Sequence, residues 1–321
     1  MNTLLLDRDG VLDEERDNDY APDNIRLLPG VAEGLKQLAS WRRFVISNQS
    51  GVARGFFTAA DVEACNERLR ELLLAEGVSL GSMLFCPHHP DDGCACRKPR
   101  LGMWEELKKK YHLRPEDCVM VGNRSSDVAF GRAIGCFTVM IPNVHPIGEF
   151  PDLIVPDLPT LASFLLRHPT PVPPVMTMEQ AVAYAERSRV DGKKIVTTNG
   201  AFDLLHPGHL FLLEQARMQG DVLIVGVNSD ASVRRYKGPD RPIEQEAVRA
   251  LKVAAHADAV FIFDDDDPRP WLPKIRPHVH ANASTYGNDS IEAPVLKEIA
   301  ASLVLVPVKP ELGSTSSILR S

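Results

Sequence analysis

The chain has 321 residues, of which 44% are apolar and 25% are charged, and its formal net charge is −7 with a pI of about 5.8. This length predicts about two domains, because a single hydrophobic core stops growing at roughly 250–300 residues. The acidic balance argues against a nucleic-acid partner, and no segment approaches the roughly 20 apolar residues of a membrane span. The opening MNTLLLDRDG has too short an apolar run for a signal peptide, so we expect a cytoplasmic protein without a membrane partner.

The first half of the chain alternates short apolar runs with helical patterns. Buried strands are predicted at 4–6, 44–47, 83–86, 119–122 and 138–141. Helices are predicted between them, at 31–40, 59–75, 102–111 and 127–134.

A proline-rich segment separates this half from the next. Residues 168–175 read HPTPVPPV, with four prolines in eight positions. Such a run is incompatible with a helix or a central strand, so it predicts an extended linker. Beyond it, strands are predicted at 195–198, 222–227, 259–263 and 303–306, with helices at 178–187, 208–219 and 245–255.

Alternating strands and helices predict the fold class α/β, with parallel sheets that carry helices on both faces. We therefore expect two Rossmann-like three-layer domains with mostly parallel sheets, at 1–167 and 176–321, on either side of the linker. Ligands of such sheets gather at the carboxyl ends of the strands. The two strongest motifs of the chain both begin at such an end.

The first of these motifs is a pair of carboxylates in the run LLLDRDG at 4–10. Asp7 and Asp9 are two positions apart, so an extended chain points both side chains to the same side. One carboxylate is then placed to attack phosphorus while its neighbour gives a proton to the leaving oxygen. A solvated acidic loop is the alternative for the pair alone, so the decision depends on later segments.

Three later segments supply other parts of a phosphoryl-transfer site. SNQSG at 47–51 follows a predicted strand and offers a hydroxyl and backbone N–H groups for a phosphate. RKP at 97–99 supplies cations, and GNRSSD at 122–127 offers oxygen ligands for Mg²⁺ after a further strand. With the carboxylate pair, these segments resemble the haloacid dehalogenase superfamily of phosphatases.

Three of the six cysteines lie close together in the sequence, with a histidine between them. Cys86, His88, Cys94 and Cys96 form the pattern C-x-H-x5-C-x-C, which suits tetrahedral Zn²⁺ better than disulfides in a cytosolic chain. Four protein ligands leave no open coordination position, so we expect a structural zinc that braces the loop ahead of Arg97 and Lys98. The other three cysteines are expected to be small buried apolar residues.

This zinc loop, DRDG and SNQSGVARG together resemble the heptose 1,7-bisphosphate phosphatases and the related histidinol-phosphate phosphatases, over about residues 1–165. SNQSGVARG matches the heptose branch better. The resemblance implies that Asp7 is the nucleophile and Asp9 the general acid and base. It also implies that phosphate and substrate contact Ser47, Asn48, Arg54, Arg97 and Lys98, and that Mg²⁺ binds Asp7, Asp9, Asn123 and Asp127.

Asn123 departs from the family, which has an aspartate at this position. An amide oxygen coordinates Mg²⁺ without the negative charge that a hard cation prefers. A fully active phosphatase, a weakened or more Mg²⁺-demanding one, and a nearly silent one therefore all remain open.

The second motif is TNGAFDLLHPGH at 198–209, where a predicted strand ends, a turn follows and a helix begins near Pro207. The first N–H groups of a helix favour phosphate, and Gly208 has no Cβ to block its approach. His206 and His209 are then placed to donate hydrogen bonds to phosphate oxygens as charge grows in the transition state. The reaction this predicts is attack by a sugar phosphate on the α-phosphorus of a nucleoside triphosphate, with loss of pyrophosphate.

The motif, together with GVNSD at 226–230, KG at 237–238 and GSTSS at 313–317, resembles the cytidylyltransferase-like superfamily, and most of all the heptose 1-phosphate adenylyltransferases. The likeness covers about residues 175–321. It implies that ATP is the co-substrate, and it leaves open a homo-oligomer formed through this domain. It assigns nucleotide or phosphate contacts to Gly200, Phe202, Asp203, Gly208, Asp230, Lys237, Arg241, Ser314 and Thr315.

One segment of this half also departs from its family. Relatives have a Lys-Gly-Gly-Asp-Tyr-like run after a late strand, where this chain reads HANASTYG at 280–287. Without the lysine, the acceptor sugar and the choice among ATP, CTP and GTP stay open.

Taken together, the resemblances imply a bifunctional enzyme of nucleotide-activated heptose synthesis for surface glycans such as lipopolysaccharide. The first domain would remove the 7-phosphate of D-glycero-D-manno-heptose 1,7-bisphosphate, and the second would join a nucleotide to the remaining 1-phosphate. One alternative is CTP and glycerol phosphate as substrates of the second domain. Another is a first domain that is structural or regulatory, which leaves the nucleotidyltransferase as the active part.

Overall fold

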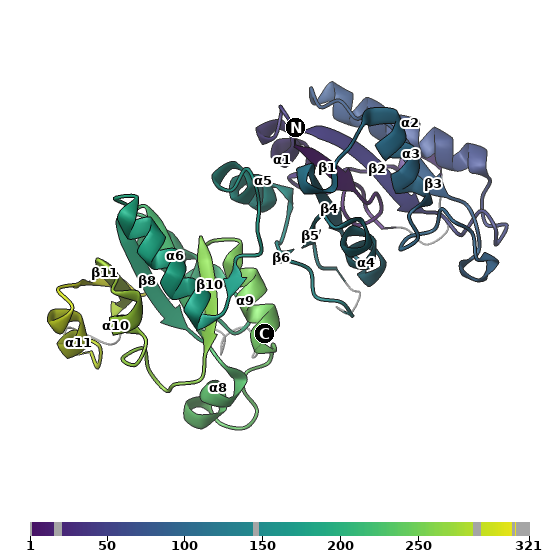
Figure 1. Ribbon diagram of the computed structural model, residues 1–321. Coiled ribbons are helices and arrows are strands. Elements are labelled where there is room, and N and C mark those ends of the chain that lie inside the picture. The colour runs from purple at the N-terminus through teal and green to yellow at the C-terminus, as the bar shows by residue number, and fades with distance from the viewer. Residues whose placement is uncertain (1, 16–20, 144–147, 285–289, 310–311, 313–321) are drawn as a thin grey trace. The chain divides into compact units, whose positions relative to one another are not determined.

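The computed structural model describes residues 2–15, 21–143, 148–284, 290–309 and 312. The chain divides into two compact units, Met1–Val172 and Pro173–Ser321. Each unit is an α/β domain, and Figure 1 shows a sheet flanked by helices in both.

In the first unit, the described residues form a sheet of six parallel strands in the order β3-β2-β1-β4-β5-β6. The strands are β1 (Thr3–Leu6), β2 (Arg42–Asn48), β3 (Met83–Cys86), β4 (Cys118–Gly122), β5 (Phe137–Met140) and β6 (Leu153–Ile154). The helices are α1 (Val31–Gln37), α2 (Ala59–Ala75), α3 (Gly102–Tyr111), α4 (Ser125–Ile134) and α5 (Leu158–Arg167).

Local sequence explains where these helices begin and end. Thr58 caps α2 in a reciprocal pair with Asp61, which satisfies two otherwise free N–H groups of the first turn. Gly135 ends α4 at φ +85°, a left-handed conformation that costs glycine no Cβ clash. Central strand β1 is fully buried, as expected for a strand with parallel neighbours on both sides.

In the second unit, the described residues form another sheet of six parallel strands, in the order β12-β11-β8-β9-β10-β7. The strands are β7 (Val175–Met176), β8 (Ile195–Gly200), β9 (Val222–Asn228), β10 (Ala259–Phe263), β11 (Val279–Ala283) and β12 (Ser302–Val306). The helices are α6 (Met178–Val190), α7 (Pro207–Arg217), α8 (Asp230–Lys237), α9 (Glu246–Ala254), α10 (Leu272–Ile275) and α11 (Ala293–Glu298).

Both sheets have a point at which the chain reverses its direction of travel across the sheet. In the first unit it runs outward from β1 to β3 and then crosses back to β4. In the second it runs outward from β8 to β10 and crosses back to β11. Loops diverge at such a point, so a crevice opens outside the carboxyl ends of the two central strands. This topology predicts ligand crevices at β1/β4 and at β8/β11.

The predicted fold class is confirmed, and several elements add to those predicted. Helix α5 and the short strand β6 of the first unit were not predicted. The start of α5 does carry two helix-start signals, Asp157 as N-cap and Pro159 in the first turn. Strand β11 was not predicted. It reads VHANA, in which His280 and Asn282 are polar but buried, and two of its apolar positions are only alanine.

The end of the proline-rich segment belongs to the second sheet. Val175–Met176 pairs with β10, and the carbonyl of Pro174 accepts a hydrogen bond from Val260 N at 2.9 Å. Strand β7 is the edge of the sheet, where prolines that lack an N–H are tolerated. Across the described part of the chain, no helix combines the length and apolar character needed to cross a membrane.

Candidate active sites

The crevice of the first unit is a pocket of about 540 Å³ at the carboxyl ends of its strands. The predicted nucleophile and acid, Asp7 and Asp9, directly follow β1, which hydrogen bonds hold between β2 and β4. Asp7 N donates to Val121 O at 2.9 Å, so the parallel ladder continues to Asp7 itself. Predicted residues that also line the pocket are Ser47, Asn48, Arg54, Arg97, Lys98 and Asp127.

A buried lysine lies at the centre of this pocket, between two carboxylates. Lys98 Nζ is 2.9 Å from Asp7 Oδ1 and 2.7 Å from Asp127 Oδ1, and it donates to Ile46 O at 2.7 Å. Lys98 is 3% exposed, Asp7 6% and Asp127 1%, so the three charges stabilise one another away from water. Burying any one of these charges without a partner would cost free energy, and together the three form a compensated cluster.

The protonation of Asp7 reflects this environment. Burial, opposed by the attraction of Lys98 and reinforced by the carboxylates of Asp127 and Asp9, raises the pKa of Asp7 to about 7. The same two neighbours, Asp127 and Asp7, outweigh desolvation and raise the pKa of Lys98. Lys98 is therefore a fixed cation at neutral pH, and any further positive charge beside Asp7 would favour its ionised form.

Asp9 is oriented by three neighbours. Its Oδ1 accepts from Arg8 Nη2 at 2.9 Å, and its Oδ2 accepts from Gln49 Nε2 at 2.6 Å. The Ser47 hydroxyl also donates to Oδ2, at 3.4 Å. Arg8 is fully buried and Gln49 is 2% exposed, so the carboxylate of Asp9 is presented to the pocket by rigid partners.

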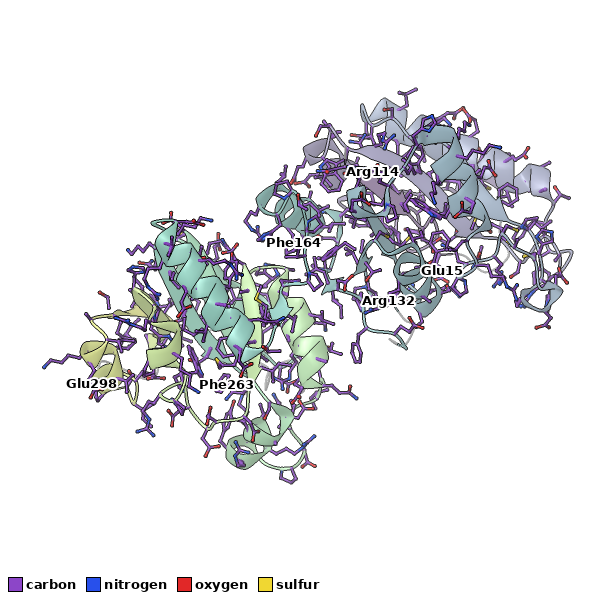
Figure 2. All side chains as sticks on the ribbon, in the orientation of Figure 1. Glu15, Arg114, Arg132, Phe164, Phe263 and Glu298 are labelled. Atoms are coloured by element: carbon purple, nitrogen blue, oxygen red, sulfur yellow. The ribbon has the colours of Figure 1, made fainter. Side chains whose placement is uncertain are left out.

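The other predicted substrate residues fall into two groups. Asn48 is committed to the main chain of Lys98, accepting from Lys98 N at 3.0 Å and donating to Lys98 O at 3.2 Å, so it fixes the lysine in place. Arg54 and Arg97 line the mouth as cations, and Arg97 Nη1 has no hydrogen-bond partner in the described structure. Arg124 also lines the mouth of the pocket, where it forms an ion pair with Glu15. Glu15 is labelled in Figure 2.

The oxygens around Asn123 suit a hard cation. Asn123 is 1% exposed, its Oδ1 is buried without a hydrogen-bond partner, and its Nδ2 donates to Asp9 O at 3.0 Å. If the Asn123 side chain were rotated so that its amide oxygen and nitrogen exchanged places, Oδ1 would face the main-chain oxygen of Asp9. A divalent cation between these two oxygens would stabilise that arrangement. Both oxygens of Asp127 are engaged, Oδ2 by the N–H groups of Asn123 and Arg124 and Oδ1 by Lys98. Asp7, the main-chain oxygen of Asp9 and the amide oxygen of Asn123 therefore remain as candidate ligands, with Asp127 behind them.

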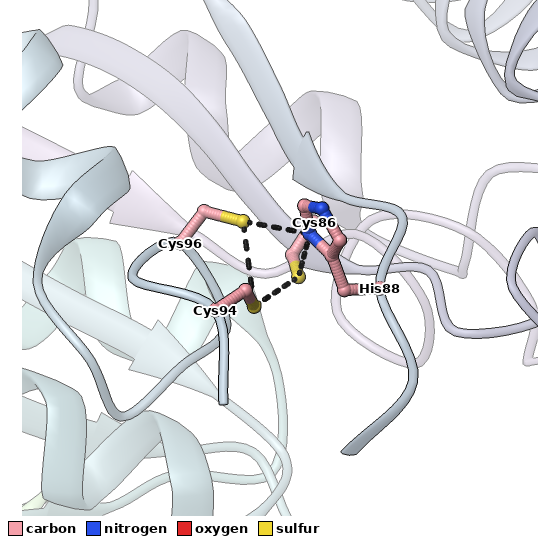
Figure 3. Close-up of side chains that lie close together, drawn as sticks. All are labelled: Cys86, His88, Cys94 and Cys96. Atoms are coloured by element: carbon pink, nitrogen blue, oxygen red, sulfur yellow. Dashed lines mark hydrogen bonds between the residues drawn. The ribbon is translucent and has the colours of Figure 1, made fainter. Parts of the chain in front are cut away.

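The four predicted zinc ligands lie together at the end of β3 and in the loop that follows it, with ligand atoms within 4.8 Å of one another (Figure 3). Cys94 Sγ is 3.5 Å from Cys86 Sγ and 3.6 Å from Cys96 Sγ, and His88 Nδ1 is 3.2 Å from Cys96 Sγ. Tetrahedral Zn²⁺ with Zn–S bonds of about 2.3 Å places its ligand atoms roughly 3.6–3.8 Å apart, so the set fits that geometry.

A bound metal ion would also change the ionisation of these thiols. Burial raises the pKa of Cys86 to about 12, and the neighbouring thiols add to the shift. Three thiolates at such distances would repel one another strongly, and a bound metal ion removes that repulsion. Lys98 follows the last ligand, Cys96, by two residues, so a metal here would brace the loop that carries the central cation of the pocket.

In the second unit, the predicted histidines form a stacked pair at the start of α7. Their ring centroids are 3.7 Å apart, and the ring of Phe202 meets His209 edge-on at 5.4 Å. His206 is the N-cap of the helix, and its Nδ1 accepts from Gly208 N at 3.1 Å. The neutral ring of His206 therefore carries its proton on Nε2, the atom left to donate to a ligand.

Both histidines are held neutral. Burial, with smaller effects of His206 and Lys237, lowers the pKa of His209 to about 3. Burial, followed by Lys237, also lowers the pKa of His206. Lys237 is thus close enough to act electrostatically on both rings, at the carboxyl end of α8. The crevice at β8/β11 therefore contains two neutral donors and one cation, an arrangement suited to phosphate oxygens.

Asp203 is engaged in holding a loop. It is 1% exposed, its carboxylate accepts from Ile243 N at 3.0 Å and Glu244 N at 3.1 Å, and it pairs with Arg241 Nη2 at 2.7 Å. Phe202 and Leu204 on either side of it both have φ +49°, so the chain is tightly turned between β8 and α7.

The remaining predicted nucleotide contacts are placed as follows. Asp230 opens α8 and pairs with the buried guanidinium of Arg249 at 2.8 Å. Gly200 is the last residue of β8, and a Cβ there would lie 3.3 Å from the ring of Phe202. Ser314 and Thr315 lie outside the described residues.

Several contributing residues were not singled out from the sequence, namely Arg8, Gln49, Glu15, Arg124 and Arg249. Arg249 had a detectable signal, because it lies four residues before Val253 on the buried side of α9. A charged residue on an apolar helix face requires buried partners. Gln49 lies within a recognised motif, but its contact with Asp9 arises only when β1 and β2 become neighbours.

Comparisons with known proteins agree with this division. A family model described as cytidylyltransferase-like matches residues 197–313, and one described as HAD-hydrolase-like matches residues 95–143. The chain thus combines a HAD-like phosphatase domain with a cytidylyltransferase-like domain.

Three individual proteins are similar to parts of this chain. The D-glycero-beta-D-manno-heptose-1,7-bisphosphate 7-phosphatase of Pseudomonas aeruginosa is 38% identical over 174 residues, which cover 51% of this chain and 97% of that protein. The bifunctional protein HldE of Acidiphilium cryptum is 43% identical over 149 residues, which cover 46% of this chain. A crystal structure of D,D-heptose 1.7-bisphosphate phosphatase from B. bronchiseptica with magnesium and phosphate is 31% identical, with a TM-score of 0.47, over 52% of this chain and 99% of that chain.

The two kinds of relative differ in how completely they are matched. The aligned segment spans 31% of the length of the HldE relative, whereas the phosphatase of Pseudomonas aeruginosa is matched over almost its whole length. Over about half of its residues, the chain therefore belongs to the family of D-glycero-beta-D-manno-heptose-1,7-bisphosphate 7-phosphatases, and it carries a cytidylyltransferase-like domain in addition.

Proposed function

We propose that this protein is a bifunctional sugar-phosphate enzyme that acts on D-glycero-D-manno-heptose 1,7-bisphosphate. Its first unit removes the 7-phosphate, and its second transfers a nucleotidyl group, AMP from ATP, to the remaining 1-phosphate with release of pyrophosphate. The observation that carries this proposal is the compensated cluster of Asp7, Lys98 and Asp127 in the first pocket, together with two neutral histidines in the second crevice. The family of the first half and the cytidylyltransferase-like match support the same pairing.

In the first unit, an Asp7 carboxylate oxygen attacks the phosphorus and the bond to the sugar oxygen breaks. Asp9 gives its proton to that leaving oxygen, and later takes one from the water that hydrolyses the aspartyl phosphate. Lys98 and the Ser47 hydroxyl hold the transferring phosphoryl group, and Arg54 and Arg97 contact the rest of the substrate from the mouth. Bound Mg²⁺ would supply positive charge beside the phosphoryl oxygens, held by Asp7, Asp9 and Asn123.

In the second unit, the sugar 1-phosphate attacks the α-phosphorus directly and no covalent enzyme intermediate forms. His206 and His209 donate hydrogen bonds to oxygens whose charge grows in the transition state. Lys237 contributes a cation at the same crevice. A structural Zn²⁺ on Cys86, His88, Cys94 and Cys96 would hold the loop of Lys98 in the other unit.

The test is phosphate release from the bisphosphate with Mg²⁺, with and without ATP, for wild type, Asp7→Asn and His206→Ala. Pyrophosphate release is measured separately, with heptose 1-phosphate and ATP supplied, so that it does not depend on the first reaction. Asp7→Asn should then lose phosphate release alone, and His206→Ala should lose pyrophosphate release alone. Loss of both activities in either variant would contradict the assignment of one reaction to each unit.

A second candidate is a phosphatase-like unit that is structural or regulatory, and Asn123 is the observation that favours it. Wild type would then make nucleotide sugar from heptose 1-phosphate but release no phosphate from the bisphosphate. The nucleotide is tested separately, by offering ATP, CTP and GTP with either heptose 1-phosphate or glycerol 3-phosphate. Preference for CTP with glycerol 3-phosphate would replace the heptose assignment of the second unit.

A further inference from the structure

The second unit contains a fully buried arginine that the proposed chemistry does not use. Arg249 is 0% exposed and lies in the first half of α9. Helix N-terminal regions disfavour positive charge, and burial of a guanidinium is costly, so this position requires strong compensating partners. The identity of those partners indicates what Arg249 does.

Arg249 reaches four acceptors that belong to four different segments. Nε donates to Glu244 O at 2.9 Å, and Nη2 donates to Asn228 O at 2.8 Å and Asp230 Oδ1 at 2.8 Å. Nη1 donates to Ala201 O. Only the planar fork of a guanidinium presents donors in all of these directions at once, because a lysine offers its three from a single point.

Each of these acceptors adjoins a segment of the proposed site. Ala201 follows β8 and leads into the turn that ends at His206, and Asn228 is the last residue of β9. Asp230 begins α8, whose last residue is Lys237. Glu244 ends the loop that carries Arg241.

Asp203, a buried anion, binds the same loop. Its carboxylate accepts the N–H groups of Ile243 and Glu244 and pairs with Arg241. The segment between α8 and α9 is therefore tied to the end of β8 by one buried anion and one buried cation. Neither charge needs a ligand to be satisfied, since each has protein partners in the described structure.

We propose that Arg249 is a positioning residue for nucleotidyl transfer, with Asp203 as its counterpart. Arg249 holds the ends of β8 and β9, the start of α8 and the loop of Arg241 in one arrangement. It thereby sets where Lys237 and Arg241 stand relative to His206 and His209. This proposal rests on the proposed function of the second unit.

The test compares Arg249→Lys with Arg217→Lys, a matched control in the same unit. Arg217 also pairs with an aspartate and a carbonyl, Asp258 at 2.9 Å and His256 O at 3.4 Å, but before β10 begins, at the amino ends of the strands. Arg249→Lys should lower kcat for nucleotide-sugar formation by about 10²-fold, because a displacement of roughly 1 Å has that effect on reacting groups. The KM for ATP should change less, and Arg217→Lys should leave kcat within twofold of wild type.

Amide hydrogen exchange supplies a readout that does not depend on turnover. Arg249→Lys should speed exchange in peptides that span 200–206 and 238–246, and Arg217→Lys should not. A variant that keeps more of the network, Asp230→Asn, should change both readouts in the same direction by less, which guards against a poorly folded Arg249→Lys. An equal fall in kcat for both arginine variants, or unchanged exchange at 238–246, would overturn the proposal.

Failure of the proposed function looks different. Wild type would then form no nucleotide sugar from any triphosphate and acceptor. In that case faster exchange at 200–206 and 238–246, with weaker ATP binding by calorimetry, supports Arg249 as the organiser of the nucleotide site, and unchanged exchange and binding reject it.

Discussion

The two units place their candidate reactive groups at the same position of the fold and give them opposite electrostatic characters. The first pocket is built from buried ions, with Lys98 between Asp7 and Asp127. The second crevice presents neutral rings, and burial lowers the pKa of His209 to about 3. Both lie where a six-stranded parallel sheet reverses its strand order. Topology therefore decides where chemistry is placed, and the side chains at strand ends decide which chemistry it is.

The contrast follows from the two proposed reactions. Covalent catalysis requires an anionic nucleophile, which must be ionised in a buried site and therefore needs a cation at hand. Direct transfer to the α-phosphorus needs hydrogen-bond donors to the developing charge. A neutral imidazole supplies one through its single N–H group and does not need a second proton. The following predictions test this difference, from the largest expected effect to the smallest.

Removing the buried cation should damage the first unit most. Lys98→Met leaves Asp7 and Asp127 buried without their partner, which should lower the free energy of unfolding of that unit by about 3–5 kcal/mol at neutral pH. Phosphate release should fall by at least about 10²-fold, as for loss of one transition-state donor. Denaturant unfolding and phosphate assays check both, with the exposed Lys36→Met as control. An unchanged unfolding transition would mean that the cluster does not depend on Lys98.

Breaking the cysteine cluster should act on the same unit through its loop. Cys96→Ser should abolish zinc binding, measured by metal analysis of the purified protein, and lower phosphate release by roughly tenfold, the scale of lost support around a metal or its ligands. Nucleotide-sugar formation should be unchanged. Cys118→Ala, a buried cysteine outside the cluster, should keep its zinc. Equal zinc content in both variants would rule out the proposed ligand set.

Restoring a carboxylate at Asn123 should make the first pocket more typical of its family. Asn123→Asp should lower the Mg²⁺ concentration for half-maximal activity by on the order of tenfold, because an added negative ligand strengthens binding of a hard cation. Titration calorimetry with Mg²⁺ measures this without turnover, and Asn24→Asp on an exposed turn is the control. No change in Mg²⁺ affinity would remove Asn123 from the metal site.

The neutral histidines predict a pH profile for the second unit. A histidine with an ordinary pKa near 6.5 would be about thirtyfold depleted in its neutral form at pH 5. Because the pKa values of His206 and His209 are lowered, nucleotidyl transfer should lose much less than this between pH 8 and pH 5. Lys237→Met removes a positive charge, so it should raise both pKa values and move the acid limb to higher pH. A wild-type profile that already falls through pH 6.5 would contradict the neutral pair.

Local patterns accounted for much of the architecture because they depend on neighbours in the sequence. The apolar run before Asp7 predicted a buried strand, and TNGAFDLLHPGH predicted a strand, a turn and a helix start. Strand β11 was missed, since its polar residues His280 and Asn282 are buried only through partners such as Thr197 and Glu292. No periodicity within VHANA reveals such partners.

The sequence by itself determined the α/β class, the two motifs at strand ends and the grouping of three cysteines with one histidine. These depend on residue type and short spacing, which a single chain displays directly. The tertiary structure decided which polar groups form hydrogen bonds with each other. Lys98 meets Asp7 across 91 positions, Gln49 meets Asp9 across 40, and Arg249 meets the carbonyl of Ala201 across 48. Parallel strands bring distant segments together at one edge of a sheet, and the hydrogen-bond partner of a buried charge is fixed only when those edges form.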